Sequence, residues 1–177
     1  MTGSEKWQNS EWQELLALTL PALRELPSHI YWSLGGGTAL SLSIDHRVSF
    51  DIDIFFENSE ALRLLHPNNN STVKGISTNF QYPGHRIRLE RNEGEIDFLI
   101  AFHMTDNPVF MYEFQNSLVP VETASEIIAK KLNYRGSKLT VRDAFDLLAV
   151  CEYDRDAFHK GVSCAQEGAR RAVDRIQ

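Results

Sequence analysis

Residues 35–53 read GGGTALSLSIDHRVSFDID, which joins a glycine turn, a short apolar stretch and a strand that carries two acids. Side chains alternate between the faces of a strand, so Asp51 and Asp53 share one face and their apolar neighbours Phe50, Ile52 and Ile54 share the other. Carboxylates at i and i+2, roughly 6.5 to 7 Å apart at Cα, can converge on divalent cations. Because oxygen ligands favour magnesium or manganese, the spacing predicts such a metal site.

The glycines supply a second half to this site. Three in a row, Gly35–Gly37, let the backbone turn and pass close to a ligand without a Cβ penalty. If Thr38 opens a helix over residues 39–44, the free amides and positive dipole end of that helix favour phosphate. A triphosphate with its magnesium ion is the simplest ligand for the whole stretch.

Each half has a plainer explanation, since a glycine run is often only a turn and alternating acids are often a solvated strand face. Their combination inside an apolar run favours a site, because an uncompensated charge there is costly. Other phosphate and calcium motifs do not fit. No lysine follows the glycines as in a P-loop, Leu40 replaces the last glycine of GxGxxG, and Phe55 and Phe56 exclude an EF-hand.

Composition and length limit the classes of protein that remain. A chain of 177 residues fits one compact domain, or a small domain with a helical appendage. Its net charge of -6 argues against a protein that coats nucleic acid nonspecifically, but it allows a local basic patch that contacts RNA. Two cysteines, no signal-peptide pattern and no apolar run of membrane-spanning length predict a cytoplasmic protein that is not inserted in a membrane.

Periodicity predicts alternating helices and strands along the first 118 residues. Helical spacing is found from Ser10, a possible N-cap, to Leu26. The other expected elements are a strand at 30–34, the strand at 50–55, a helix begun by Asn58 or Ser59 and ending at Leu65, a loop at 66–72, and a hairpin of 85–90 with 95–101. In this hairpin Asp97 shares a face with Glu95. It is expected either to join Asp51 and Asp53 as a third carboxylate or to be an ordinary solvent-facing acid.

The sequence predicts helices over residues 119–177. A capping box of Thr123 and Glu126 lies within the helical stretch 119–135, and a similar box at Thr140 and Asp143 opens the next helix. Taken alone, Asp143 is explained by capping and Lys131 by a solvated lysine. We therefore expect a core over residues 1–118 with an N-terminal helix, and a helical region over 119–177 packed on it.

The first stretch and the later run ETASEIIAKKLNYRGSKLTVRDAFDL, residues 122–147, together resemble the AbiEii/AbiGii toxin family of nucleotidyltransferases. This family belongs to the polymerase-β-like superfamily, which uses a glycine turn followed by DxD. The resemblance covers residues 31–147. It implies an α+β fold, in which helices flank a small mixed sheet and the C-terminal part is helical.

The resemblance also implies roles for particular residues. Metal would be held by Asp51 and Asp53, with Asp97 as the less secure third ligand and the base for the acceptor hydroxyl. The triphosphate would be bordered by Gly36, Gly37 and Thr38 and contacted by Lys131, which Asp143 and Asp146 would position. Arg47 and Ser49 fall on the HRxSxD part of the motif, where Arg47 either neutralises phosphate or pairs with an acid.

The implied reaction is magnesium-dependent transfer of a nucleoside monophosphate from a nucleoside triphosphate to an acceptor hydroxyl, with release of pyrophosphate. The family implies RNA, in some members tRNA, as acceptor and an antitoxin as partner. The basic residues that offer phosphate contacts are Arg86, Arg88, Arg91, Lys130, Arg135, Lys138 and Arg142. Two alternatives stay open: transfer to a small aminoglycoside-like molecule, and a catalytically degenerate fold that only binds a protein or nucleotide.

Overall fold

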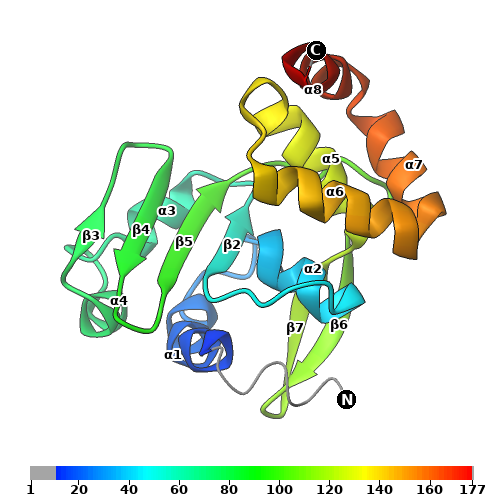
Figure 1. Cartoon of the computed structure of the whole chain (residues 1–177). Helices are drawn as coiled ribbons and strands as arrows, with labels where there is room; N and C mark the ends of the chain where they lie inside the picture. The colour runs from blue at the N-terminus through cyan, green and yellow to red at the C-terminus, as the bar shows by residue number, and fades with distance from the viewer. Residues whose placement is uncertain (1–10, 177) are drawn as a thin grey trace. The chain divides into compact units, whose positions relative to one another are not determined.

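The structure, a computed structural model, describes residues 11–176 (Figure 1). Its contacts divide the described chain into two compact units, one of residues 11–38 and 47–102 and the other of residues 39–46 and 103–176. The expected N-cap Ser10 lies outside the described residues. The boundary expected between residues 118 and 119 stays a prediction.

The first unit is built on a sheet with the strand order β3-β4-β5-β2-β1 (Figure 1). In it β2 and β5 run parallel, whereas β1 with β2, β3 with β4 and β4 with β5 are antiparallel. The strands are β1 (Trp32–Gly35), β2 (Ile52–Phe56), β3 (Phe80–Gln81), β4 (Arg86–Glu90) and β5 (Glu95–Ile100). The expected hairpin is therefore confirmed as β4 and β5.

Alternation along β2 fixes which face of the sheet is the core. Ile52 and Ile54 are completely buried, while Asp53 between them is only half-buried. On β5 Ile96 and Phe98 are also completely buried, but Asp97 between them is buried too, with 7% of its surface exposed. The acids thus lie on the face opposite the apolar core, as the sequence predicted.

Helices α1 (Trp12–Arg24), α3 (Glu60–Leu65) and α4 (Ser71–Ile76) complete the first unit. Ser59 precedes α3 without capping it through its side chain, and the Asn58 side chain accepts the amide of Glu60 at 2.8 Å. The stretch expected to be a loop is helical from Ser71 onward, because the Asn70 side chain caps α4 by accepting the amide of Val73.

Helix α2 (Gly36–Ile44) starts earlier than the sequence indicated. Thr38 lies within its first turn and does not cap it. Its buried hydroxyl donates to the backbone carbonyl of Asp51, so the turn is tied to the segment that leads into β2.

The second unit contains a β-hairpin and a set of helices. The hairpin joins β6 (Val109–Phe114) to β7 (Ser117–Glu122) through Gln115 and Asn116, both at positive φ. The helices are α5 (Ala124–Arg135), the 3-10 turn η1 (Gly136–Lys138), α6 (Val141–Tyr153), α7 (Arg155–Cys164) and α8 (Gln166–Ile176). Among the described helices, none is both long and apolar enough to cross a bilayer.

Candidate active site

Two acids, Asp53 on β2 and Asp97 on β5, lie side by side on one face of the sheet, and a third, Asp51, directly precedes β2. In the parallel pairing Asp53 stands directly opposite Asp97, so their side chains share a face. Asp51 lies two residues before Asp53, and its Oδ1 accepts the amide of Glu95 at the start of β5, at 3.0 Å. The structure therefore brings Asp97 beside Asp53, which the sequence left open.

Arg88 on the neighbouring strand β4 binds this group of acids. It is paired in register with Asp97, and its Nε and Nη2 donate to the two carboxylate oxygens of Asp97 at 3.0 and 2.6 Å. Its Nη1 lies 2.7 Å from Glu95 Oε2. The hydrogen bonds with Asp97 raise the pKa of Arg88 above its usual value. Arg88 thus pairs with acids, whereas the sequence suggested a phosphate contact.

Glu95 lies beside this arginine and is harder to ionise than a free carboxyl group. Burial is the main cause of its raised pKa; the charge of Arg88 opposes the rise, and the charges of Asp51 and Asp97 add to it.

The fold class implies a divalent metal, and the side chains on this face agree with one in ligand chemistry. Asp51 and Asp53 offer carboxylate oxygens only, the donors that magnesium and manganese prefer. Among residues 11–176, no three acidic, histidine or cysteine side chains form a ready-made metal cluster. Both oxygens of Asp97 are bonded to Arg88. The assignment of metal to Asp51, Asp53 and Asp97 stays a prediction.

The glycine turn fits tightly around its neighbours. Gly36 has a φ of +66°, and a Cβ there would overlap Oδ2 of Asp53. A Cβ at Gly37 would overlap Nη2 of Arg47 and come within 3.3 Å of the Ser49 hydroxyl. The first turn of α2 therefore faces a guanidinium and a hydroxyl, with Asp53 alongside. Amides, dipole and guanidinium together favour a phosphate at this point.

Gly37→Ala tests the role of this turn. We expect the fold to persist, because the obstructing atom is the end of the flexible Arg47 side chain. Displacing that guanidinium should raise the KM for the nucleoside triphosphate roughly three- to tenfold, about the worth of one charge-assisted contact. Steady-state kinetics and thermal unfolding measure both. The matched control is Gly75→Ala, where a Cβ meets nothing within 4 Å; equal KM values in the two variants would contradict the prediction.

A second cluster of charged groups lies within the second unit. Lys131 Nζ is 2.6 Å from Asp143 Oδ1 and 3.1 Å from Asp146 Oδ2, and both acids are almost fully buried. Asp143 also closes a capping box with Thr140 at the start of α6, so capping and lysine positioning both apply to it. The cluster and the carboxylates of β2 and β5 belong to different units, and contact of Lys131 with phosphate stays a prediction.

His46 joins this cluster and was not singled out from the sequence. Its Nε2 lies 2.7 Å from Asp146 Oδ1, its ring stacks on Phe145, and its side chain is only 5% exposed. Asp146 is thus held between a histidine and a lysine. The available signal was the position of His46 directly before Arg47 in the HRxSxD motif.

Asp143 should make stability depend on pH in the acid range. Burial alone would raise its pKa, but the charge and hydrogen bond of Lys131, with hydrogen bonds from Thr140, bring the pKa down to about 2 from 3.8. A lowered pKa stabilises the fold above the unfolded value, and this contribution disappears as pH falls from about 4 to 2. We expect Asp143→Asn to lose about 1 kcal/mol of unfolding free energy at pH 5, allowing for screening.

Urea unfolding at several pH values measures this difference, which should shrink toward pH 2. Asp106→Asn removes an exposed carboxylate in the same unit and is the control. A constant difference from pH 5 to pH 2 would show that Asp143 acts through capping geometry alone.

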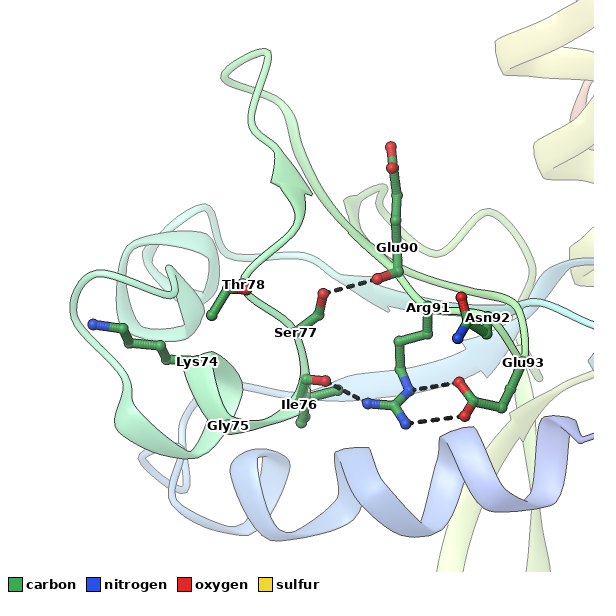
Figure 2. Close-up of a pocket in the computed structure, with 9 residues that line it drawn as sticks. All are labelled: Lys74, Gly75, Ile76, Ser77, Thr78, Glu90, Arg91, Asn92 and Glu93. Carbon is green, nitrogen blue, oxygen red and sulfur yellow. Dashed lines mark hydrogen bonds and ion pairs between the residues drawn. The ribbon is translucent and has the colours of Figure 1, made fainter.

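A polar pocket of about 390 Å³ also lies in the first unit, between the end of α4 and the β4–β5 turn (Figure 2). Arg91 crosses it, bonded to Glu93 and to the backbone carbonyl of Ile76. None of the residues that the sequence singled out for metal or triphosphate lines this pocket. The candidate active site is therefore the face with Asp53 and Asp97.

Solved structures with a similar fold include nucleotidyltransferases. The crystal structure of ANT(2")-Ia in complex with adenylyl-2"-tobramycin has a TM-score of 0.61 at 14% identity, covering 90% of this chain and 100% of that chain. The lincomycin-bound lincosamide antibiotic adenylyltransferase LnuA has a TM-score of 0.53 at 15% identity, covering 80% and 96%. No curated protein matches the sequence significantly.

The α+β fold is therefore the fold found in these nucleotidyltransferases, with the polymerase-β-like arrangement. Residues 19–174 match the model of the nucleotidyl transferase AbiEii toxin family of type IV toxin-antitoxin systems. The chain belongs to the AbiEii family, which confirms the resemblance drawn from the two sequence motifs.

Proposed function

We propose that this nucleotidyltransferase uses magnesium or manganese to transfer a nucleoside monophosphate from a nucleoside triphosphate to a hydroxyl group of RNA, with tRNA as the leading candidate. Membership in the AbiEii family supports a toxin, paired with an antitoxin in the cytoplasm. The observation that carries the proposal is the register of Asp53 with Asp97 beside the first turn of α2. This arrangement supports a site in which the acids and the glycine turn act on one triphosphate.

The reaction is an in-line displacement at the α-phosphorus. A bond forms between the acceptor oxygen and phosphorus as the bond to the β-phosphate oxygen breaks, and pyrophosphate leaves. The hydroxyl proton passes to Asp97, whose orientation Arg88 fixes by a two-point hydrogen bond. The amides of the glycine turn, with Arg47 and Ser49, hold the phosphates in place.

Asp51 and Asp53 would hold the divalent cation, which when bound supplies charge stabilisation to the entering and leaving oxygens. Asp53 is positioned for this by its contact with Gly36, and Asp51 by the amide of Glu95. Lys131 is proposed to contact the phosphates, with Asp143 and Asp146 fixing its ammonium group.

Incubation of the protein with total RNA and each of the four α-labelled triphosphates tests the proposal. We expect one or more nucleotides to label RNA with magnesium and not with a chelator, and Asp51→Ala to leave no labelled product. Transfer by Asp51→Ala at the wild-type rate would overturn the assignment of the site. Rescue of toxicity by a neighbouring gene would support the antitoxin.

A small hydroxylated acceptor is the second candidate, favoured by the names of the structural neighbours. ANT(2")-Ia is solved with adenylyl-2"-tobramycin and LnuA with lincomycin, on chains that this protein covers almost entirely. Screening aminoglycosides and lincosamides with labelled triphosphate separates the candidates. If the protein transferred label to a drug and none to RNA, the small hydroxylated acceptor would be favoured.

A further inference from the structure

The residues that join α5 to α6 form the centre of a basic surface. From Asn133 to Arg142 the chain carries three basic residues and no acid, although its net charge is -6. Arg135 ends α5, Lys138 ends η1 and Arg142 lies in the first turn of α6. All three are exposed. We call these three residues, with Tyr134 and Arg175, the basic corner.

Helix α8 adds its arginines to this region. A Cβ at Gly168 would overlap the backbone carbonyl of Leu132, so the glycine lets α8 approach the end of α5 closely. Arg171 donates to the carbonyl of Asn133 at 3.3 Å, and Arg175 to that of Ser137 at 3.0 Å. Arg171 is paired with Glu167 at 2.7 Å, so Arg175 is the arginine of α8 that we include with the basic residues between α5 and α6.

An exposed aromatic side chain lies among these cations. The side chain of Tyr134 is 52% exposed and precedes Arg135 directly. Phe145 is also half exposed, and one face of its ring is covered by His46. Cations that follow a backbone, combined with aromatic rings on which bases stack, are typical of surfaces that bind single-stranded nucleic acid.

The structure also separates these residues from the other basic candidates in the sequence. Arg88 is paired with Asp97 and Glu95, Arg91 with Glu93, and the buried Lys130 with Glu122. Arg135 contacts Asp143 but keeps its side chain 56% exposed. Lys138, Arg142 and Arg175 are exposed as well.

We propose that the basic corner binds single-stranded RNA, with Lys138, Arg142 and Arg175 on phosphates and Tyr134 stacked on a base. This inference rests on the proposed function, since the strand bound here is the acceptor of nucleotidyl transfer. It adds the surface through which that acceptor is recognised.

The test is binding of a fluorescein-labelled 12-nucleotide single-stranded RNA, followed by anisotropy from 50 to 200 mM KCl. We expect the double variant Lys138→Gln/Arg142→Gln to bind about tenfold more weakly at 50 mM. Its slope of log K against log salt should fall by about 1.4, which corresponds to two lost phosphate contacts. Tyr134→Ala should weaken binding about tenfold and leave the slope unchanged.

The control is Arg63→Gln/Lys74→Gln, which removes the same charge from exposed positions of the first unit. The proposal that the basic corner binds RNA would be overturned if the control variant bound RNA as weakly as the test variants, or if the test variants bound RNA as tightly as the wild-type protein. Asp51→Ala distinguishes this result from the proposed function, because it should bind the RNA normally while transferring nothing. If Asp51→Ala transferred nucleotide normally, the proposed catalytic site would fail, and the binding result would stand by itself.

Discussion

Asp53→Asn is expected to lower the rate of nucleotidyl transfer by about 10³-fold or more. Asparagine keeps the shape of the side chain, so the close contact with Gly36 is retained. What is lost is a negative charge beside Asp97, on the face where a metal and a triphosphate are proposed to meet. Removing one electrostatic contributor to a transition state commonly lowers kcat by a factor of 10² to 10³, and loss of a metal ligand adds to this.

Initial rates of pyrophosphate release measure this effect, with thermal unfolding to show that the variant is folded. Asp106→Asn, an exposed aspartate of the second unit, is the matched control and should keep the wild-type rate. A variant at Asp53 that stayed folded and kept more than a tenth of the wild-type rate would contradict the proposed role. Titration with manganese adds a second measurement, because weaker metal binding should shift the midpoint upward.

The sequence predicted the local features of this site because each depends on a short pattern. Alternation placed Asp51 and Asp53 on one face, opposite Ile52 and Ile54, and burial along β2 agrees. Thr140 and Asp143 predicted the capping box that begins α6, and it is present. Such features are decided by neighbours a few residues apart.

Features that depend on pairing between distant segments were not predictable in the same way. The parallel register of Asp53 with Asp97 is set by how β5 packs beside β2. The pairing of Arg88 with Asp97 depends on the register of the β4–β5 hairpin, which the prediction of a hairpin did not include, so a residue that looked like a phosphate contact binds an acid. The register between two paired strands leaves no periodic pattern in a single sequence.

One error arose because a side chain found another partner, and two others concern the strands that precede α5. Glu126 was expected to complete a capping box with Thr123, but its carboxylate accepts the backbone amides of Met104 and Thr105. Strand β7 reaches Glu122, so α5 begins only at Ala124. The turn of the β6–β7 hairpin contains Gln115 and Asn116 without a glycine, which hid it from the usual turn pattern.

Lys130→Met is expected to lower the unfolding free energy by about 3 to 5 kcal/mol. The Lys130 ammonium lies 2.5 Å from Glu122 Oε1 and 3.6 Å from Glu126 Oε1, and both carboxylates are fully buried. Methionine fills a similar volume, so the loss comes mainly from leaving a buried negative charge without its cation. Urea unfolding measures this loss.

Two further variants separate the ion pair from other roles of Lys130. Glu122→Gln/Lys130→Met removes the two closest charges, and we expect it to recover part of the lost stability, because the remaining carboxylate of Glu126 keeps its hydrogen bonds from the amides of Met104 and Thr105. Lys138→Met, an exposed lysine, should change stability by less than about 0.5 kcal/mol. If Lys130→Met were as stable as Lys138→Met but bound RNA more weakly than the wild-type protein, Lys130 would be a phosphate contact, as the sequence suggested. Retained RNA binding at low temperature, with reduced stability, would instead show that Lys130 supports the fold.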